Sequence, residues 1–327
     1  MSLSAQDLLQ ISSKAEFQAA ALATFKDQYE SIAFYRSYVD LLGIQAASIT
    51  HYSQIPFLPI RFFKTQQILR EGLDPVLHFE SSGTTSEQSS KHFLAETQLY
   101  NQLSVANFES VYGTLKDYCI LALLPSYLEI GQSSLVYMVQ HFMNVSQHPM
   151  NGFFLHDLSK LAETLSVLEQ QQQKVLLIGV TYALLDFAEQ FPMPLPNTIV
   201  METGGMKGRR KEMLREEVHS VLKSAFSKDA IHSEYGMTEL LSQAYAPSEG
   251  LFSCPSWMRV LLRDPNDPLS VSNELGSGAV NIIDLANQDS CAFIATDDLG
   301  FLTKENQFRI LGRLDEAELR GCNLLVQ

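Results

Sequence analysis

The residue types best suited to chemistry occur in a short segment that places several hydroxyl groups around one glycine. Residues 81–86 read Ser-Ser-Gly-Thr-Thr-Ser, between a strand-like run at 76–79 and a helical pattern that begins near Glu96. Hydroxyls and backbone amides are the donors that a polyphosphate needs, and a glycine lets the backbone approach closely. Lys91 could add a mobile positive charge. The segment lacks the Walker pattern, and alone it fits a phosphate loop and a flexible polar loop equally well.

Further polar segments follow strand-like runs later in the chain. Residues 202–207 read Glu-Thr-Gly-Gly-Met-Lys, and residues 231–239 read Ile-His-Ser-Glu-Tyr-Gly-Met-Thr-Glu. Residues 296–300, Thr-Asp-Asp-Leu-Gly, come next, and residues 310–315, Ile-Leu-Gly-Arg-Leu-Asp, come last. Each segment alone could arise by chance, whereas all of them in this order form a specific pattern.

A hydroxyl-rich loop followed by Y-G-x-T-E, T-x-D-L-G and G-R-x-D resembles the adenylate-forming superfamily of acyl-CoA synthetases, peptide-synthetase adenylation domains and luciferase. The resemblance covers roughly residues 55 to 322. It implies that ATP activates a carboxylic acid, whose carboxylate attacks the α-phosphate to give acyl-AMP and pyrophosphate. Positioning and charge neutralisation would supply most of the catalysis.

The resemblance also implies a role for each motif residue. The residues expected to bind the β- and γ-phosphates are Ser81, Ser82, Gly83, Thr84, Thr85 and Lys91. Those expected to border the adenine are Gly204, Gly205 and Tyr235. Those expected at the α-phosphate and the ribose are Thr238, Asp298 and Arg313. Glu239 would hold Mg²⁺, a hard cation suited to carboxylate and phosphate oxygens.

Each of these assignments has a structural alternative. Tyr235 could be a core residue, Asp298 could cap a turn and Arg313 could be a surface ion-pair partner. Glu239 could be an ordinary helix carboxylate. Asp297 stands where the superfamily usually has glycine, so the choice between Asp297 and Asp298 stays open.

The end of the chain resembles a narrower branch, the acyl-protein synthetases (LuxE). The resemblance is carried by residues 124–129, Leu-Pro-Ser-Tyr-Leu-Glu, by residues 133–137, and by the terminal Arg-Gly-Cys-Asn at 320–323. That branch activates a fatty acid and moves the acyl group to a cysteine near its own C-terminus, then to a reductase partner. The resemblance implies that Cys322 is the acyl acceptor, since a thiolate is the nucleophile that such a transfer needs. The alternative is an incidental or buried cysteine.

Composition narrows the classes of partner. The formal net charge of -14 argues against a nucleic-acid-binding surface, which needs clustered Lys and Arg. The longest apolar run, near residues 175–185, is far shorter than the roughly 20 residues of a membrane helix. The first residues lack the basic and apolar regions of a signal peptide, so we expect a cytoplasmic protein. None of the four cysteines forms a C-x-x-C pair.

Apolar strand-like runs alternate with helical patterns up to about residue 245, and shorter strand-like pieces follow. This texture predicts an α/β protein with mostly parallel sheets covered by helices, plus a small β-barrel-like subdomain. By resemblance this is the N-terminal region of the adenylate-forming enzymes, without the small C-terminal domain that carries a lysine in most members. The expected division is 1–245 for the α/β body with its N-terminal helices and 246–327 for the β subdomain and tail.

Two rival functions stay open on the sequence. The first is an aryl- or acyl-CoA ligase, which would share the activation step but pass the acyl group to coenzyme A. The second is a binding protein of the same fold that has lost catalysis, suggested by Asp297 and by Ser86-Glu87 where the superfamily loop usually continues with glycine. The expected ligands are ATP, Mg²⁺ and a small carboxylic acid, and an acyl-accepting reductase or carrier protein is the expected partner.

Overall fold

The computed structural model describes residues 3–81, 88–125, 132–204, 213–272, 275–304 and 306–314. The chain forms two compact units, and each unit collects segments that are far apart in the sequence. The first unit contains residues 1–103, 238–242 and 253–327, and the second contains 104–237 and 243–252. The division after residue 245 expected from the sequence stays a prediction.

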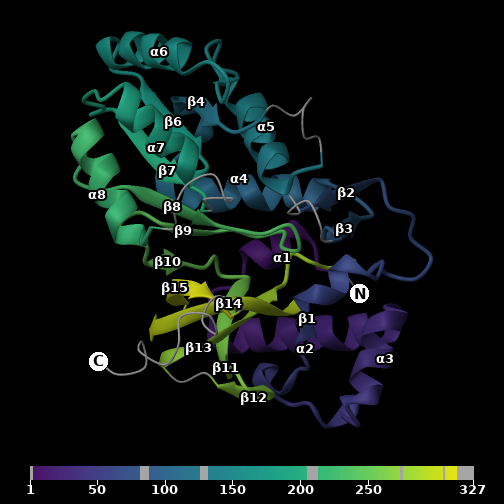
Figure 1. The fold of residues 1–327 in the computed structure, drawn as a ribbon. Coiled ribbons are helices and arrows are strands. Elements are labelled where there is room, and N and C mark those ends of the chain that lie inside the picture. The colour runs from purple at the N-terminus through teal and green to yellow at the C-terminus, as the bar shows by residue number, and fades with distance from the viewer. Residues whose placement is uncertain are drawn as a thin grey trace. The chain divides into compact units, whose positions relative to one another are not determined.

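The second unit is built on a mostly parallel sheet (Figure 1). Its parallel strands lie in the order β5-β4-β6-β7-β8, and β9 pairs with β8 in the antiparallel sense. Their bounds are β4 Tyr118–Leu123, β5 Gly152–Phe153, β6 Lys174–Gly179, β7 Thr198–Glu202, β8 His232–Tyr235 and β9 Ala244–Ala246. Every residue of β4 is buried, which requires cover on both faces of the sheet.

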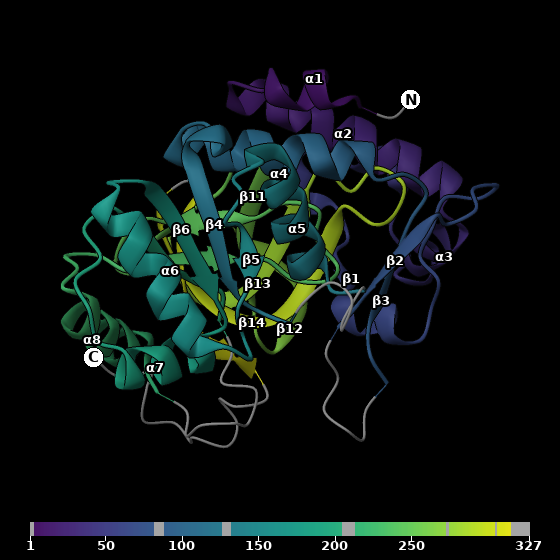
Figure 2. The same cartoon turned by 90° about the horizontal axis from the view of Figure 1, so that it is seen from above.

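Helices provide that cover. α5 lies on one face of the sheet, and α6 and α7 lie on the other, as right-handed crossovers require (Figure 2). α4 packs against α5 through Phe108 and Phe142, whose ring centroids are 5.3 Å apart. The bounds are α4 Gln98–Tyr112, η4 Leu115–Asp117, α5 Ser134–Ser146, α6 Leu158–Gln170, α7 Thr181–Gln190 and α8 Arg215–Phe226. The sequence predicts strands over 118–125, 174–179, 197–203 and 230–235, and helices over 133–143, 158–171, 182–190 and 211–227. The structure has each of these elements, with ends within four residues of the predicted ones.

The N-terminal helical region belongs to the first unit and is interrupted twice. The sequence predicts helix from about residue 6 to 42, whereas the structure has α1 (Ala5–Leu9), α2 (Lys14–Ser31) and α3 (Ala33–Leu41). The Ser13 side chain accepts from the backbone of Glu16 in a capping box, which starts α2 afresh. Ile32 is extended, with φ -116° and ψ 96°, and separates α2 from α3.

The first unit also holds an antiparallel sheet with the strand order β12-β11-β13-β14-β15, to which β1 adds a parallel pairing with β14. A separate antiparallel strand pair, the β2–β3 hairpin, flanks the hydroxyl-rich segment in the sequence. The strands are β1 Leu58–Pro59, β2 Leu77–Glu80, β3 Lys91–Leu94, β10 Phe252–Ser253, β11 Met258–Asp264, β12 Asp267–Ser272, β13 Gly276–Asp284, β14 Phe293–Lys304 and β15 Gln307–Arg313. The short helices are η1 Ala46–Ser48, η2 Tyr52–Gln54 and η3 Ile60–Lys64. The predicted fold class, a parallel α/β body with a small β unit, is confirmed.

Phe293 tests the core that joins α2 to this antiparallel sheet. The residue is fully buried, stacks on Tyr35 at 6.2 Å and meets Phe25 edge-on at 6.2 Å. We expect Phe293→Ala to lower the free energy of unfolding by about 3–5 kcal/mol, because it leaves a cavity among aromatic rings. Phe301→Ala, on the exposed part of the same strand, should cost less than about 1 kcal/mol in the same urea titration. Equal losses in the two variants would contradict this packing.

Candidate nucleotide site

The β2–β3 hairpin pins together the two ends of the hydroxyl-rich segment. The Ser81 backbone N–H donates to the Ser90 carbonyl at 3.0 Å, and the Ser90 N–H donates to the Ser81 hydroxyl at 2.9 Å. The Ser89 hydroxyl donates to the Glu80 carboxylate. Lys91 begins β3 with its side chain exposed. Four expected phosphate ligands, Ser82, Gly83, Thr84 and Thr85, lie outside the described residues, so their role stays a prediction.

Glu239 lies next to this hairpin within the first unit. It is only 5% exposed, and the Ser90 hydroxyl donates to its carboxylate. Burial raises the pKa of Glu239 above its ordinary value, although the Ser90 contact and the charge of Arg313 act in the opposite direction. The negative charge of Asp298 adds to the rise. The structure therefore brings together three of the residues that the sequence predicts, Glu239, Asp298 and Arg313, and adds Ser90.

The backbone after Glu239 is fixed by a buried carboxylate. Asp284, fully buried at the end of β13, accepts from the Leu241 N–H at 2.8 Å and from the Ser242 N–H at 3.0 Å. It also accepts from the Ser242 hydroxyl at 2.6 Å. Such contacts are needed because residues 238–242 belong to no helix or strand that could satisfy their polar groups. The segment that carries Thr238 and Glu239 is thus fixed by side chains.

Asp297 and Asp298 sit on a bulge in β14. On the neighbouring β13, Ala279 faces Leu299 and Asn281 faces Ala295, so β14 has extra residues between these pairs. The buried Thr296 hydroxyl donates to the Val280 carbonyl at 2.8 Å and accepts from the Asp298 N–H at 3.2 Å. A bulge of this kind turns side chains that would otherwise alternate between the two faces of the sheet.

Arg263 holds the bulge from β11, which lies on the other side of β13. Its buried guanidinium donates to the Thr296 carbonyl at 2.6 Å and to the Val280 carbonyl at 2.8 Å. Both oxygens lie at the point where the β13–β14 ladder is interrupted. Arg263 therefore acts on the Asp297–Asp298 pair by fixing the backbone that precedes it.

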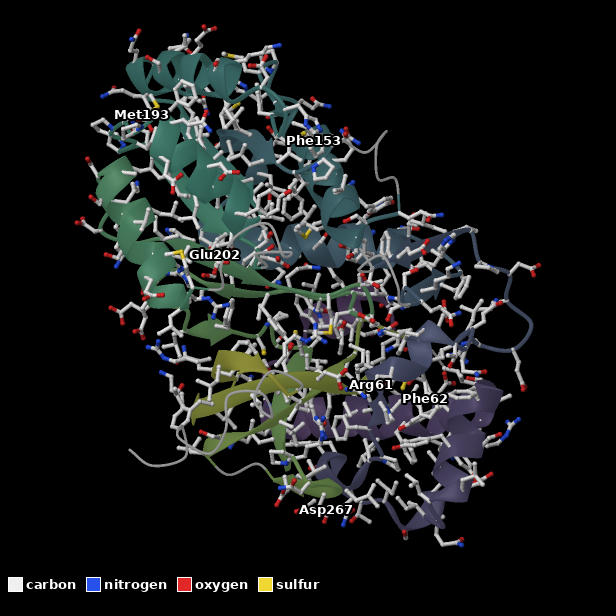
Figure 3. The ribbon with its side chains drawn as sticks, in the orientation of Figure 1. Arg61, Phe62, Phe153, Met193, Glu202 and Asp267 are labelled. Atoms are coloured by element: carbon white, nitrogen blue, oxygen red, sulfur yellow. The ribbon has the colours of Figure 1, made fainter. Side chains whose placement is uncertain are left out.

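The two aspartates have different surroundings. Asp297 accepts from Arg61 Nε at 3.0 Å and lies 3.9 Å from Arg313 Nη2; Arg61 comes from η3 (Figure 3). Asp298 is the strand partner of Arg313 in the β14–β15 ladder. The side chain of Arg313 is 58% exposed. Asp297 is thus paired with Arg61, and the expected contact of Asp298 with a ribose stays a prediction.

In the second unit, Gly204 follows the carboxyl end of β7, the edge at which open α/β sheets bind ligands. Its φ of +71° is a left-handed conformation that favours glycine. Its N–H donates to Glu202 Oε2 at 2.8 Å, and the preceding Thr203 N–H donates to the Gly179 carbonyl at 3.0 Å. Gly205 lies outside the described residues.

Glu202 is a buried charge at the end of β7 (Figure 3). Its carboxylate lies 3.0 Å from Arg215 Nε and 3.6 Å from His219 Nε2 on α8. Burial alone would raise the pKa of Glu202, but the His219 contact and the Arg215 charge outweigh it and lower the pKa to about 2. Glu202 is therefore ionised and ties the turn at Gly204 to α8.

Tyr235 ends β8, again at the carboxyl end of a parallel strand. The residue is 9% exposed, and its ring lies 5.7 Å from the Phe252 ring. Its predicted contact with adenine stays a prediction. Thr238, three residues further on, is half-buried in the first unit.

Sequence reasoning missed the residues that support these side chains. Arg61, Ser90 and Arg263 were not assigned to the site. Arg263 gave little signal, because it stands between the apolar residues 260–262 and Asp264, where an exposed arginine would be equally expected. Ser90 gave no sequence signal beyond its position next to the hydroxyl-rich segment.

Solved structures of adenylate-forming enzymes share this fold. The chain matches ATP-bound MatB from Rhodopseudomonas palustris with a TM-score of 0.54 and 15% identity, covering 75% of this chain and 49% of that one. It matches 2-hydroxyisobutyryl-CoA ligase in complex with 2-HIB-AMP and CoA with a TM-score of 0.64 and 12% identity, covering 94% and 77%. The chain thus spans about half the length of the MatB chain. No curated protein sequence matches the chain significantly.

The chain therefore shares the fold of these solved enzymes. Residues 6–327 match the family described as acyl-protein synthetase, LuxE, which covers nearly the whole chain. The protein belongs to the LuxE acyl-protein synthetase family. The resemblance drawn from the sequence motifs is confirmed. None of the helices in the described ranges is long and apolar enough to span a bilayer.

The Glu202 ion pair predicts a pH-dependent contribution to stability. Because its pKa of about 2 lies below the ordinary 4.5, the stabilisation is complete above pH 4.5 and is lost as the pH falls toward 2. We expect Glu202→Gln to lower the free energy of unfolding by about 3 kcal/mol at neutral pH and by much less near pH 3. Glu216→Gln, an exposed carboxylate on α8, should match the wild type within about 0.5 kcal/mol throughout. Urea unfolding across this range measures both, and a loss independent of pH would refute the assignment.

Proposed function

We propose that this chain uses ATP to activate a carboxylic acid as acyl-AMP, with release of pyrophosphate, and then transfers the acyl group to a protein cysteine. The observation that carries the proposal is the grouping of Ser90, Glu239, Asp298 and Arg313 in the first unit. An arginine, two carboxylates and a hydroxyl at the base of a hydroxyl-rich hairpin suit a nucleotide. Membership of the LuxE family supports the same activity.

The proposed chemistry assigns a task to each side chain. A carboxylate oxygen of the acid attacks the α-phosphorus of ATP, and the bond to the bridging oxygen breaks as pyrophosphate takes its electron pair. Arg313 and Thr238 would offset charge that gathers on the α-phosphate, and Asp298 would accept from the ribose hydroxyls. Donors held in place before the reaction stabilise such charge most effectively. The hydroxyl-rich segment and Lys91 would bind the other two phosphates.

Glu239 fits the expected Mg²⁺ in its chemistry. Its carboxylate and the neighbouring Ser90 hydroxyl are hard oxygen ligands, and its burial leaves the charge in need of a cationic partner. Across the described ranges, no group of three or more His, Cys, Asp or Glu could by itself hold a metal ion. Mg²⁺ usually combines one or two carboxylates with substrate phosphates, which matches a single glutamate. When bound, the ion would neutralise phosphate charge.

The acceptor proposed from family resemblance is Cys322, which lies outside the described residues. In the transfer, its sulfur attacks the acyl carbonyl, AMP leaves with the electron pair of the broken C–O bond, and the thiol proton passes to solvent. The other three cysteines support this assignment indirectly. Burial raises the pKa of Cys119, Cys254 and Cys291 to about 12, so each is a poor nucleophile.

The fatty nature of the acid and the further transfer to a reductase or carrier protein are also proposed from the family. The second candidate function is an acyl- or aryl-CoA ligase, favoured by the structural likeness to a CoA ligase. In that case coenzyme A would replace Cys322 as acceptor. Measurable ATP or acid binding without any pyrophosphate exchange would instead favour a binding protein of the same fold.

The activation step is tested by acid-dependent exchange of labelled pyrophosphate into ATP, screened over fatty and aromatic acids. Glu239→Gln and Asp298→Asn should each lower kcat/KM for ATP by about 10²-fold or more, because they remove groups aimed at the nucleotide. Glu71→Gln, an exposed residue paired with Arg36, should retain wild-type exchange. Exchange that survives both site variants would refute the assigned site.

The transfer step is tested by the intact mass of the protein after incubation with ATP and the acid that supports exchange. The wild type should gain one acyl group that hydroxylamine removes, and Cys322→Ser should gain none while exchange continues. Cys254→Ser serves as the matched control and should be acylated like the wild type, because its thiol is a poor nucleophile. Stable acylation of Cys322→Ser would refute the acceptor, and a thioester formed only with coenzyme A would favour the ligase.

A further inference from the structure

A histidine and an asparagine connect the loop-bearing hairpin to the Thr238–Glu239 backbone. His92 lies on β3, the strand that returns from the hydroxyl-rich segment, and is 1% exposed. Its Nδ1 lies 2.9 Å from the Thr238 carbonyl oxygen, and its Nε2 lies 3.0 Å from Asn287 Oδ1. Asn287 Nδ2 donates to the Glu239 carbonyl at 2.9 Å. Two consecutive carbonyls are therefore reached by one pair of buried side chains.

The protons in this chain of contacts can be counted. It has three contacts, and both ends are carbonyl oxygens, which only accept. A neutral imidazole offers one N–H, and the amide offers one N–H along the chain, so two protons serve three contacts. Rotating the amide by 180° moves the deficit to the Glu239 carbonyl but does not remove it. Only an imidazolium would complete all three contacts.

The surroundings of the His92 ring disfavour the positively charged imidazolium. Burial lowers the pKa of His92 to about 4, although the contacts with Thr238 and Asn287 favour the protonated form. Phe63 on η3 meets the ring edge-on at 5.7 Å. A neutral ring with its proton on Nδ1 bonds the Thr238 carbonyl, and the other tautomer bonds Asn287. The position of one proton thus decides which contact is made.

The Asn287 side is fixed by other groups. Gln28 on α2 donates to the Asn287 carbonyl at 2.6 Å, and Asn287 itself is fully buried. Asp284, three residues earlier, holds Leu241 and Ser242. His92 is therefore the member of the network that comes from the hairpin, and the rest belongs to the 284–287 turn and the segment it supports.

We infer that His92 is a positioning residue, which sets Thr238 and Glu239 at a fixed place relative to the loop-bearing β2–β3 hairpin. Because its ring is buried against Thr238 and Asn287, it would act through the Thr238 carbonyl directly and through the Glu239 carbonyl by way of Asn287. The catalytic part of this inference rests on the proposed function, whereas the positioning part rests on the contacts alone. A displacement of about 1 Å in such groups can cost about 10²-fold in rate.

Amide hydrogen exchange tests the positioning directly. We expect His92→Ala to speed exchange in residues 238–242, while β4 and β6 of the second unit remain as protected as in the wild type. His78→Ala is the matched control, because His78 lies on the partner strand of the same hairpin and is partly exposed. Unchanged exchange at 238–242 in His92→Ala would overturn the inference, whatever the activity.

Pyrophosphate exchange tests the catalytic consequence. His92→Ala should lose about 10- to 100-fold in kcat, while KM for the acid changes by less than about twofold. His92→Asn, whose amide can occupy the Nδ1 position and donate to the Thr238 carbonyl, should recover most of the loss, and His92→Gln should recover less. Equal activity in all four proteins would overturn the catalytic part.

The Asn and Gln variants also guard against misfolding, since both are isosteric in part and remain informative if His92→Ala does not fold. The failure of the proposed function has a different signature. In that case the wild type would show no pyrophosphate exchange with any of the acids tested, while His92→Ala would still speed amide exchange in residues 238–242. The positioning role then stands and the proposed function falls.

Discussion

A buried stretch of backbone outside any helix or strand must have its polar groups satisfied by side chains, and the candidate site depends on one such stretch. Residues 238–242 carry Thr238 and Glu239, and three buried side chains bind their backbone. His92 and Asn287 contact carbonyl oxygens, and Asp284 accepts from N–H groups. Loss of one such partner leaves a buried group unpaired, which costs more than the net value of one hydrogen bond. The site is therefore rigid where it presents Glu239, although it contains no regular structure there.

On β14, too, a buried side chain forms hydrogen bonds with backbone groups that lack a partner in regular structure. There the pairing with β13 is interrupted at the Thr296–Asp298 bulge. The buried guanidinium of Arg263 donates to the Thr296 carbonyl at this point. In both places a strongly polar side chain is enclosed in the protein because exposed or unpaired backbone would be worse. Stability and site geometry are thus coupled, since the groups that satisfy the backbone are those that orient the carboxylates.

Sequence motifs predicted the residues that the structure groups in the candidate site but not the residues that hold them in place. Glu239, Asp298 and Arg313 lie in short patterns that carry their own spacing, and apolar runs predicted β4, β6 and β7 because buried parallel strands are continuously apolar. His92 and Asn287 are 195 positions apart, so no local pattern relates them. β12 was missed because the alternation of Leu269 and Val271 with serines is too short to distinguish a strand from a loop. The sequence could not predict which buried polar groups form hydrogen bonds with side chains far away in the chain.

Asp297 stands where the superfamily usually has glycine, and its contacts with two arginines explain how the structure accommodates it. Two adjacent carboxylates on one bulge repel each other, and a glycine at the first position would avoid that cost. Here Arg61 lies 3.0 Å from Asp297, and Arg313 lies on its other side at 3.9 Å. The extra negative charge is therefore balanced by a cation from η3, with Arg313 on its other side. An aspartate is therefore tolerated where the superfamily usually has glycine, because an arginine from another element offsets its charge.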